Sequence, residues 1–304
     1  MIKVWDSIIV GGGPAGLSAA LILGRCRRSV LLIDALSQRN RFAARMHGFL
    51  TRDGISPQEF LEIARSQLRP YSTIHSIDDE VVDVLFAGNL FQARLRGDQQ
   101  VCAHCILLAT GVIDHLPDIE GIQPLYGHSV HHCPYCDGWE WRDKRIGAFG
   151  SGDEKGGGLA LMLKQWSADV QLFSNGPAGL SPAMQARMTK QNISIREGKI
   201  LRLEGEGRWL KRLVHNDGTS VPCDALFFNT AQHQCSQLAS RLGCRMTARG
   251  GVDTGEHDVK TEIPGLFVAG DATRDVQLVA VAAAEGAKAA FAINRVLLDR
   301  DGLL

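Results

Sequence analysis

The 304-residue sequence has no surplus of charge of either sign and no long apolar run. Its 33 basic residues balance 33 acidic ones, which argues against nucleic acid as a partner and against a solvated acidic tail. The longest apolar stretch lies near 276–284 and is far shorter than the roughly 20 residues that a membrane-spanning helix needs. These absences predict a globular protein that binds neither nucleic acid nor membrane.

We also expect no secretory leader. An apolar strand is predicted at Ile8–Val10, and cleavage near the N-terminus would remove it. Without a leader, the eight cysteines do not indicate a secreted scaffold held together by disulfides. We therefore expect a cytoplasmic protein whose paired cysteines serve metal or redox chemistry.

Glycine, by contrast, is abundant: 33 of 304 residues, roughly 11% against a usual 7%. The first cluster, Gly11–Gly16, follows the strand at 8–10 and precedes a helix of small residues from Leu17 to Leu23. A second apolar strand, Val30–Ile33, ends on Asp34. Strand, glycine turn, helix and strand form a βαβ unit with a parallel sheet.

The spacing Gly11-x-Gly13-x-x-Gly16 predicts a dinucleotide site. The first glycine allows a tight turn, the second removes a side chain that would block a pyrophosphate, and the third lets the helix pack on the strand. Asp34 is placed to accept hydrogen bonds from an adenosine ribose. A glycine-rich turn without a ligand is the alternative.

A second βαβ pattern repeats the first at an offset of about 139 residues, from Gly11 to Gly150. A capping box at Ser56–Glu59 predicts a helix to about Leu68, and alternation around Gly88-Asn89 predicts a hairpin. The composition shifts near Leu116-Pro117, where we expect a domain junction. The predicted fold class is α/β, with two Rossmann-like three-layer nucleotide-binding domains, the second inserted in the first. The expected ranges are 1–117 plus 245–304 for one domain and 118–244 for the other.

The far end of the chain bears on which dinucleotide binds. Gly270-Asp271 follows a buried strand, so the carboxylate is placed for a ribityl hydroxyl. A helix that begins near Val276 would direct its positive end at the anionic edge of a reduced flavin.

Four segments, Gly11–Gly16, Ala109-Thr110-Gly111, Cys133–Gly138 and Gly270-Asp271, together resemble the low-molecular-weight, bacterial-type thioredoxin reductases. The resemblance covers essentially the whole chain and implies FAD in the first domain, a homodimer, and a thioredoxin-like protein or small disulfide as partner. The cofactor-binding residues that it and the motifs imply are Gly11, Gly13, Pro14, Ala15, Gly16, Asp34, Asn40, Ala109, Thr110, Gly111, Gly270, Asp271 and Gln277.

Cys133-x-x-Cys136 is the predicted chemical centre. Two thiols at this spacing can close a disulfide and can attack in sequence. A nearby protonated histidine would favour a thiolate, and His131 and His132 are the candidates. The resemblance implies that Cys136 faces the flavin, that Cys133 meets the substrate, and that Asp137 gives a proton to the departing thiolate. The predicted catalytic residues are Cys133, Cys136, Asp137 and His132.

Zinc is the alternative, because Cys102 and Cys105 form another CxxC. However, the gap to Cys133 is longer than in zinc ribbons, and residues i and i+3 of a strand point to opposite faces. We therefore favour redox chemistry and assign no metal. The remaining cysteines are expected to be buried small apolar residues. They are Cys26, Cys223, Cys235 and Cys244.

The second glycine turn departs from the family pattern. Lys155 stands at the third position of the motif. Ser174 stands at the position that corresponds to Asp34 of the first unit, so this position has no acidic side chain. The arginines expected for a 2′-phosphate are absent from Ser174–Pro177, and the sequence leaves open whether the glycines at 156–158 relax the turn. These departures predict poor NADPH use.

Divergent relatives include ferredoxin-linked reductases, dithiol oxidases and proteins that hold a second flavin or other nucleotide. We therefore expect an FAD-dependent dithiol–disulfide oxidoreductase that is not a typical NADPH enzyme, with ferredoxin as a further partner to test. The alternatives are a dithiol oxidase using oxygen on a small dithiol and a flavin-binding protein without turnover. Trp139 and Trp141 are expected to pack rather than to stack on a ligand.

Overall fold

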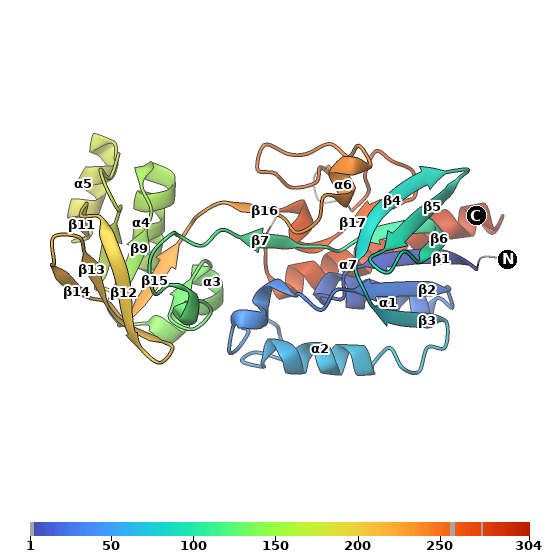
Figure 1. Ribbon diagram of the computed structural model, residues 1–304, viewed down its shortest axis with the longest axis horizontal. Coiled ribbons are helices and arrows are strands. Elements are labelled where there is room, and N and C mark those ends of the chain that lie inside the picture. The colour runs from blue at the N-terminus through green and yellow to red at the C-terminus, as the bar shows by residue number, and fades with distance from the viewer. Residues whose placement is uncertain (1–2, 256–258, 275) are drawn as a thin grey trace. The chain divides into compact units, whose positions relative to one another are not determined.

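The computed structural model describes residues 3–255, 259–274 and 276–304 (Figure 1). The chain divides into two compact units. Unit 1 comprises Met1–Arg41, Gly48–Ile113 and His233–Leu304, and unit 2 comprises Phe42–His47 and Asp114–Gln232. Each unit combines helices with a largely parallel sheet, which confirms the predicted α/β fold class.

The sheet of unit 1 has the strand order β3-β2-β1-β6-β5-β4, with β17 beside the second half of β6. Strands β3, β2, β1, β6 and β17 run parallel, and β4 and β5 form the predicted hairpin. All five residues of β2 are buried, as expected for a parallel strand covered on both faces. The strands are β1 (Val4–Val10), β2 (Val30–Asp34), β3 (Ile74–Asp78), β4 (Val81–Ala87), β5 (Leu90–Leu95), β6 (Gln100–Leu108) and β17 (Leu266–Val268).

Helices α1 (Pro14–Arg25) and α7 (Val279–Arg300) pack together beside this sheet. Small residues make the approach close, because a Cβ atom added to Gly286 would lie 2.0 Å from the carbonyl oxygen of Ala15. Helix α2 (Pro57–Ser66) begins as predicted, with the Ser56 side chain accepting a hydrogen bond from the Glu59 amide at 3.1 Å.

Unit 2 repeats the strand order of the unit 1 sheet, although its edge strand β8 comes before β9 in the chain whereas the corresponding β17 comes after β6. Its parallel sheet has the order β11-β10-β9-β15-β8, which matches β3-β2-β1-β6-β17 strand for strand. A three-stranded antiparallel sheet, β12-β13-β14, packs against it. The strands are β8 (Val130–His131), β9 (Ile146–Phe149), β10 (Val170–Phe173), β11 (Ser194–Arg196), β12 (Ile200–Glu206), β13 (Trp209–His215), β14 (Ser220–Pro222) and β15 (Ala225–Phe228).

The remaining helices are short. Those of unit 2 are α3 (Pro134–Asp137), α4 (Leu159–Leu163), α5 (Pro182–Lys190), the 3₁₀ turns η2 (Gln123–Leu125) and η3 (Gly138–Trp141), and the π-helix η4 (Gly152–Gly158). Those of unit 1 are α6 (Leu238–Arg241) and η5 (Gly270–Thr273), while η1 (Arg39–Phe42) crosses the boundary between the units.

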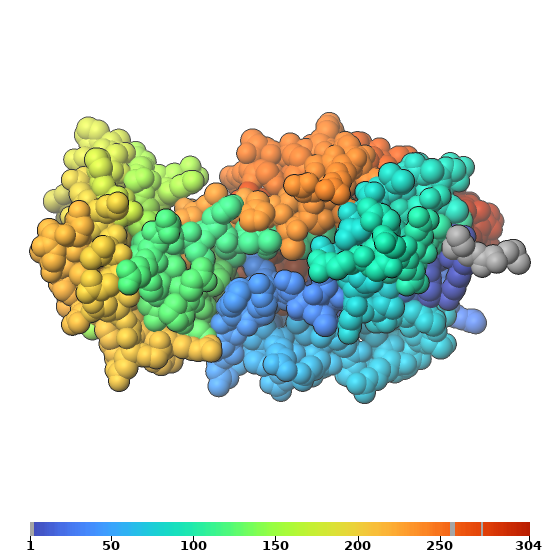
Figure 2. Space-filling model, in the orientation of Figure 1, coloured from blue at the N-terminus to red at the C-terminus, as the bar shows by residue number. Residues whose placement is uncertain are grey.

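The return of the chain to unit 1 occurs earlier than the predicted residue 245. Leu238 and Ala239 of α6 are buried in the same core as Val81 and Val84 of β4. Figure 2 shows the orange segment around α6 against the teal β4–β5 hairpin. The segments that link the units, β7 (Val112–Asp114) and β16 (Gln232–Gln234), pair as a two-stranded sheet.

In the parts of the chain that the structure describes, no helix combines the length and the apolarity needed to cross a bilayer.

The α1–α7 contact gives a stability prediction. In an ordinary exposed helix, replacing glycine by alanine stabilises by about 1 kcal/mol. At Gly286 we expect the opposite sign, a loss of about 1–3 kcal/mol, because the new Cβ would overlap the Ala15 carbonyl oxygen. Chemical denaturation of Gly286→Ala would measure this. Ala284→Gly, at an exposed α7 position, is the matched control for propensity alone, and a stabilised Gly286→Ala would contradict the close packing.

Candidate active site

The first glycine turn joins β1 to α1 and brings backbone atoms into direct contact. Gly11 has φ +108°, and its N–H donates to the Ile33 carbonyl at 2.8 Å. A Cβ on Gly11 would lie 2.3 Å from the Ala109 oxygen, and one on Gly16 would lie 1.9 Å from the Gly11 oxygen. Neither position therefore admits a side chain, as the motif predicts.

Gly13 differs from these two, because a Cβ placed there would meet no atom within 4 Å. It is the N-cap of α1, no side chain caps this end of the helix, and no acidic residue lies in the first turn. The predicted Pro14 and Ala15 open the helix. The positive end of α1 thus faces open space, which fits a phosphate group.

The other predicted cofactor residues lie mostly at the same sheet edge. Ala109, Thr110 and Gly111 follow β6, and Gly270 and Asp271 follow β17. Because β2, β1, β6 and β17 are parallel neighbours, their carboxyl ends share one edge. Ligands of open α/β sheets bind at such an edge.

Asp34 ends β2 at this edge, but its carboxylate is engaged by its own chain. It accepts hydrogen bonds from the Leu36 amide at 3.1 Å, from Gln38 at 2.9 Å and from Arg65 at 2.7 Å. A Cβ on Gly12 would lie 2.2 Å from Asp34 Oδ2, so Gly12 is as constrained as its neighbours. The motif spacing did not identify Gly12, although three glycines in succession were the available signal.

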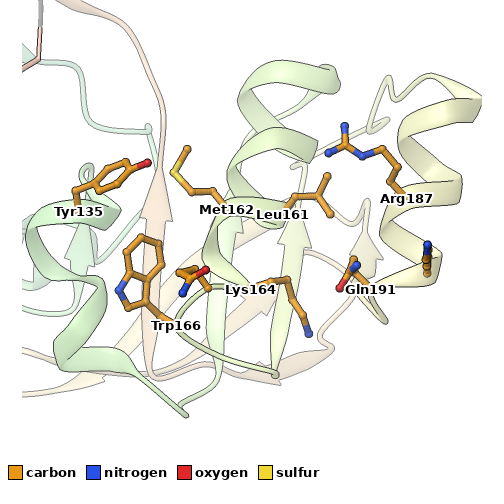
Figure 3. A pocket seen from close by; sticks show the side chains of 9 residues that line it. Tyr135, Leu161, Met162, Lys164, Trp166, Arg187 and Gln191 are labelled. Carbon is orange, nitrogen blue, oxygen red and sulfur yellow. The ribbon is translucent and has the colours of Figure 1, made fainter.

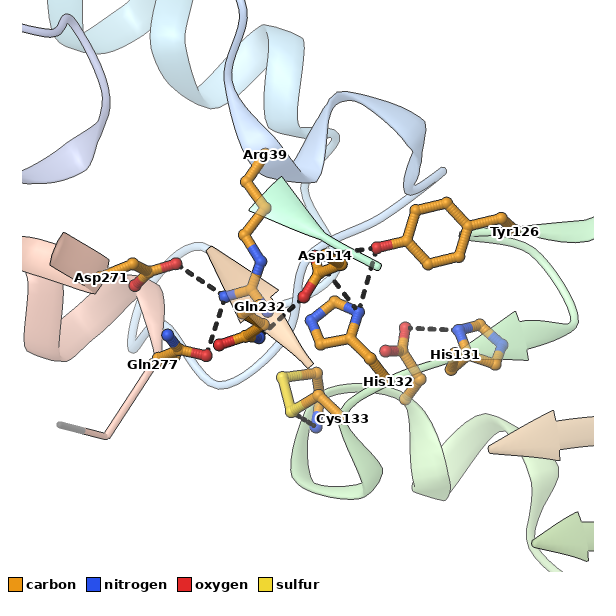
Figure 4. The surroundings of a disulfide bond; sticks show 11 residues. Arg39, Asp114, Tyr126, His131, His132, Cys133, Gln232, Asp271 and Gln277 are labelled. Carbon is orange, nitrogen blue, oxygen red and sulfur yellow. Dashed lines mark hydrogen bonds and ion pairs between the residues drawn. A yellow bond between two sulfur atoms is a disulfide. The ribbon is translucent and has the colours of Figure 1, made fainter. Parts of the chain in front are cut away.

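Arg39 joins two predicted residues that are far from it in sequence (Figure 4). Its Nη1 donates to Asp271 Oδ2 at 2.8 Å and to Gln277 Oε1 at 3.1 Å. Sequence reasoning selected the adjacent Asn40, which is half-buried in η1. Nothing near Arg39 in the sequence marked it as a site residue, because its two partners are distant in the chain. Asp271 follows β17, and Gln277 precedes α7.

The cysteine pair opens α3 in unit 2. Cys133 is the N-cap residue, Pro134 occupies the first turn, and the Sγ atoms of Cys133 and Cys136 form a disulfide. The Cys136 N–H donates to Cys133 Sγ at 3.1 Å. After reduction the same N–H would stabilise a thiolate on Cys133.

The two candidate histidines have different surroundings (Figure 4). His131 is buried, accepts a hydrogen bond from the Trp141 indole at 2.9 Å, and has Nδ1 3.4 Å from Asp137 Oδ1. His132 lies with Nδ1 3.2 Å from the Tyr126 hydroxyl. That hydroxyl donates to Asp114 Oδ2 at 3.0 Å.

The carboxylate of Asp114 on β7 extends this network, because it also accepts a hydrogen bond from Gln232 on β16 at 2.7 Å. The two linking strands are therefore tied together through side chains as well as through their backbones. Of these residues only His132 was predicted as a site residue, and the contact between Asp114 and Gln232 joins residues 118 positions apart.

The other cysteines divide into three groups, of which the half-buried Cys102 forms one by itself. Burial raises the pKa of the Cys105 and Cys223 thiols to about 12 and that of Cys244 to about 11. Cys26 and Cys235 are exposed, so the expectation that they are buried was wrong. Cys26 caps the end of α1 and Cys235 follows β16, and both positions lie outside the core. Among the residues described, no cluster of three or more histidine, cysteine or acidic side chains could hold a metal ion.

The second glycine turn contains one residue more than the first. Gly150 has φ +153°, and its N–H donates to Phe173 O at 3.1 Å, as Gly11 does to Ile33. A Cβ atom added to Gly156 would lie 2.7 Å from the Gly150 oxygen. Gly156, rather than Lys155, is therefore the residue that packs against Gly150. The extra residue is accommodated by the π-helix η4. Gly156 therefore takes the close-packing position that Lys155 holds in the motif spacing, which answers the question that the sequence left open for the glycines at 156–158.

The chain itself covers this second turn. The Gly152 N–H, which would face a pyrophosphate, donates to Ala178 O at 2.7 Å, and the Ser181 N–H donates to Asp153 Oδ1 at 2.7 Å. Hydrogen bonding to Ser181 holds the pKa of Asp153 below its usual range, so the turn carries a negative charge at neutral pH. Ser174, at the position that matches Asp34, donates its hydroxyl to Gly176 O at 2.6 Å.

A groove of about 780 Å³ lies in unit 2 at the C-terminal ends of α4 and α5 (Figure 3). Tyr135, from between the two cysteines, lines it together with Trp166, and their rings meet edge to face at 6.0 Å. Lys164, Arg187 and Lys190 are its charged lining residues. Because these helices run antiparallel to the strands, the groove lies at the sheet edge opposite the glycine turn.

Comparison with known proteins identifies the family of this chain. A sequence model of the pyridine nucleotide-disulphide oxidoreductases matches residues 5–286. The chain belongs to this family. Membership, with the relatives below, confirms the predicted enzyme class, a flavin-dependent disulfide oxidoreductase that resembles thioredoxin reductase.

Three relatives illustrate the similarity. A probable thioredoxin reductase of Arthroderma benhamiae is 30% identical over 302 residues, which span 89% of this chain and 74% of that protein. A thioredoxin reductase of Gibberella zeae is 28% identical, over 95% of this chain and 97% of that protein. The crystal structure of TrxB from Bacillus anthracis superposes with a TM-score of 0.92 at 32% identity, over 98% of this chain and 99% of that one.

The cysteine environments predict a labelling pattern. At pH 8, iodoacetamide should modify the exposed Cys26 of the native protein within minutes. Cys105 and Cys223 should stay unmodified until unfolding, because a thiol with a pKa of about 12 is ionised in only about one molecule in ten thousand at this pH. Mild reduction should add Cys133 and Cys136 to the labelled set. Peptide mass mapping would check this, and rapid native labelling of Cys223 would contradict the burial.

Proposed function

We propose that the protein is an FAD-dependent dithiol–disulfide oxidoreductase in which electrons pass between the flavin and the Cys133–Cys136 pair. The observation that carries the proposal is the disulfide at the start of α3, with the Cys136 N–H directed at Cys133 Sγ. A backbone donor at this sulfur makes Cys133 the better thiolate and hence the sulfur that meets an external disulfide. Cys136 is then the sulfur that exchanges electrons with the flavin.

The features of unit 1 support FAD as the cofactor. The open space beside Gly13 at the positive end of α1 fits a pyrophosphate, and the segment Ala109–Gly111 and Asp271 lie at the same sheet edge for the rest of the molecule. Bound FAD would supply a two-electron carrier. The division of labour that we propose therefore assigns the flavin to unit 1 and the redox disulfide to unit 2.

The features of unit 2 argue against NADPH as the ordinary electron donor. The Gly152 amide is already bonded to Ala178, and the charged Asp153 lies in the same turn. A pyrophosphate would have to break the hydrogen bond between Gly152 and Ala178 and to approach the negative charge of Asp153. Ser174 offers no carboxylate for a ribose. A thioredoxin-like protein or a small disulfide remains the proposed partner on the cysteine side.

The covered second turn favours one further candidate function. If a nucleotide does not deliver electrons, a small dithiol would reduce the Cys133–Cys136 disulfide, and the flavin would pass the electrons to oxygen. Such a dithiol oxidase would form peroxide with a small dithiol faster than it reduces thioredoxin. Measuring both rates on one preparation separates the two functions.

Replacing the flavin-side sulfur tests the role of the pair. We expect Cys136→Ser to bind flavin as the native protein does but to lose at least about 99% of its disulfide turnover, because no intramolecular disulfide can form. Flavin absorbance and steady-state turnover measure the two properties. Cys26→Ser, at an exposed cysteine outside the pair, is the matched control and should retain full turnover. Undiminished turnover of Cys136→Ser would disprove the assignment.

Anaerobic stopped-flow absorbance tests the electron donor. With micromolar NADPH or NADH we expect slow or incomplete bleaching of the flavin, because the second turn is covered by Ala178 and carries Asp153. A dithiol and reduced ferredoxin, added in separate arms, should identify the donor by faster bleaching. Complete bleaching by NADPH within the dead time would refute this part of the proposal.

A further inference from the structure

His131 occupies a closed position beside the cysteine pair. It ends β8, is only 5% exposed, and lies with its ring 5.2 Å from that of Phe227 and 6.0 Å from that of Trp141. Both of its ring nitrogens have polar neighbours. Nε2 accepts the Trp141 indole N–H at 2.9 Å, and Nδ1 is 3.4 Å from Asp137 Oδ1.

These contacts fix where the imidazole proton resides. An indole nitrogen can only donate, so His131 Nε2 must present its lone pair to Trp141. In the neutral ring the proton is then on Nδ1, which faces the Asp137 carboxylate. Protonation at Nε2 would set two N–H groups against each other. The ring is therefore held as a donor toward Asp137.

We propose that His131, locked in the Nδ1–H tautomer by Trp141, is a positioning residue for Asp137. It orients the carboxyl group and stabilises the carboxylate left after Asp137 has given a proton to a departing sulfur. This inference rests on the proposed redox role of the cysteine pair. It adds two residues, His131 and Trp141, that act through Asp137 and do not touch the substrate.

The step balances as thiol–disulfide exchange. The Cys133 thiolate attacks one sulfur of an external disulfide, forms a mixed disulfide and expels the other sulfur, which takes a proton relayed from water through the Asp137 carboxyl group and leaves as a thiol. The Cys136 thiol then attacks Cys133, closes the internal disulfide and passes its proton to the second departing sulfur, so the pair supplies both electrons. The Asp137 side chain is 21% exposed, so water reaches the carboxyl group.

The tautomer is tested without reference to turnover. In ¹⁵N-labelled native protein, the His131 ring should show a protonated Nδ1 and a bare Nε2. Trp141→Phe removes the indole N–H, and the tautomer mixture should then shift toward Nε2–H. Trp139→Phe is the matched control, because Trp139 is 64% exposed, and should leave the spectrum unchanged. A native spectrum with Nε2–H at His131 would overturn the inference.

Pre-reduced enzyme and two substrates test the effect on proton delivery. A dialkyl disulfide such as hydroxyethyl disulfide expels a basic thiolate that needs a proton, whereas an aryl disulfide such as dithiobis-nitrobenzoate expels a stable one. His131→Leu removes the donor and should slow the dialkyl reaction about tenfold, with the aryl reaction unchanged. His131→Asn places an amide N–H near the Nδ1 position and should recover most of the rate.

A purely structural role of His131 gives a different pattern. Equal losses with both substrates, or no recovery in His131→Asn, would overturn the positioning role. If the native pre-reduced enzyme reacts with neither disulfide, the proposed function itself fails, while the tautomer measurement still stands. The two failures are therefore distinguishable.

Discussion

The structure depends on a close backbone contact made twice, once in each unit. In unit 1 the closing glycine of the turn, Gly16, lies against the Gly11 carbonyl, and in unit 2 Gly156 lies against that of Gly150. Each contact sets a helix N-terminus directly at the end of a parallel strand. The surroundings of the two turns differ, because the space beside Gly13 is open whereas Gly152 is bonded to Ala178. The same backbone geometry therefore leaves open space at the helix N-terminus in unit 1, whereas in unit 2 the chain itself occupies the amide of Gly152.

Two polar contacts of α3 surround the cysteine pair. The Cys136 amide reaches Cys133, and the carboxylate of the next residue, Asp137, meets the buried His131. Tyr135, between the cysteines, is 74% exposed and borders a groove whose charged lining residues are cationic. The cysteine pair thus lies between the buried His131–Asp137 contact and the exposed side chain of Tyr135.

Features with local causes could be predicted from the sequence. The first glycine turn, the capping box at Ser56 and the β4–β5 hairpin each depend on residues close together in the chain. Features that depend on distant partners could not. Arg39 meets Asp271, 232 positions away, only after the strands are arranged, and the π-helix η4, which moves the closing glycine of the second turn to position 156, has no signal in the motif spacing. The exposure of Cys26 and Cys235 was not predicted, because the residue type alone does not show whether a cysteine lies in the core or at the surface.

The central claim is that a bound flavin and the Cys133–Cys136 disulfide exchange electrons. An anaerobic titration of the purified yellow protein with dithionite, read by flavin absorbance and by thiol count, tests it most directly. We predict uptake of about four electrons per chain, two by the flavin and two by the disulfide, with two new thiols at Cys133 and Cys136. Uptake of only two electrons with the disulfide intact, or a colourless protein that takes up no flavin, would contradict it.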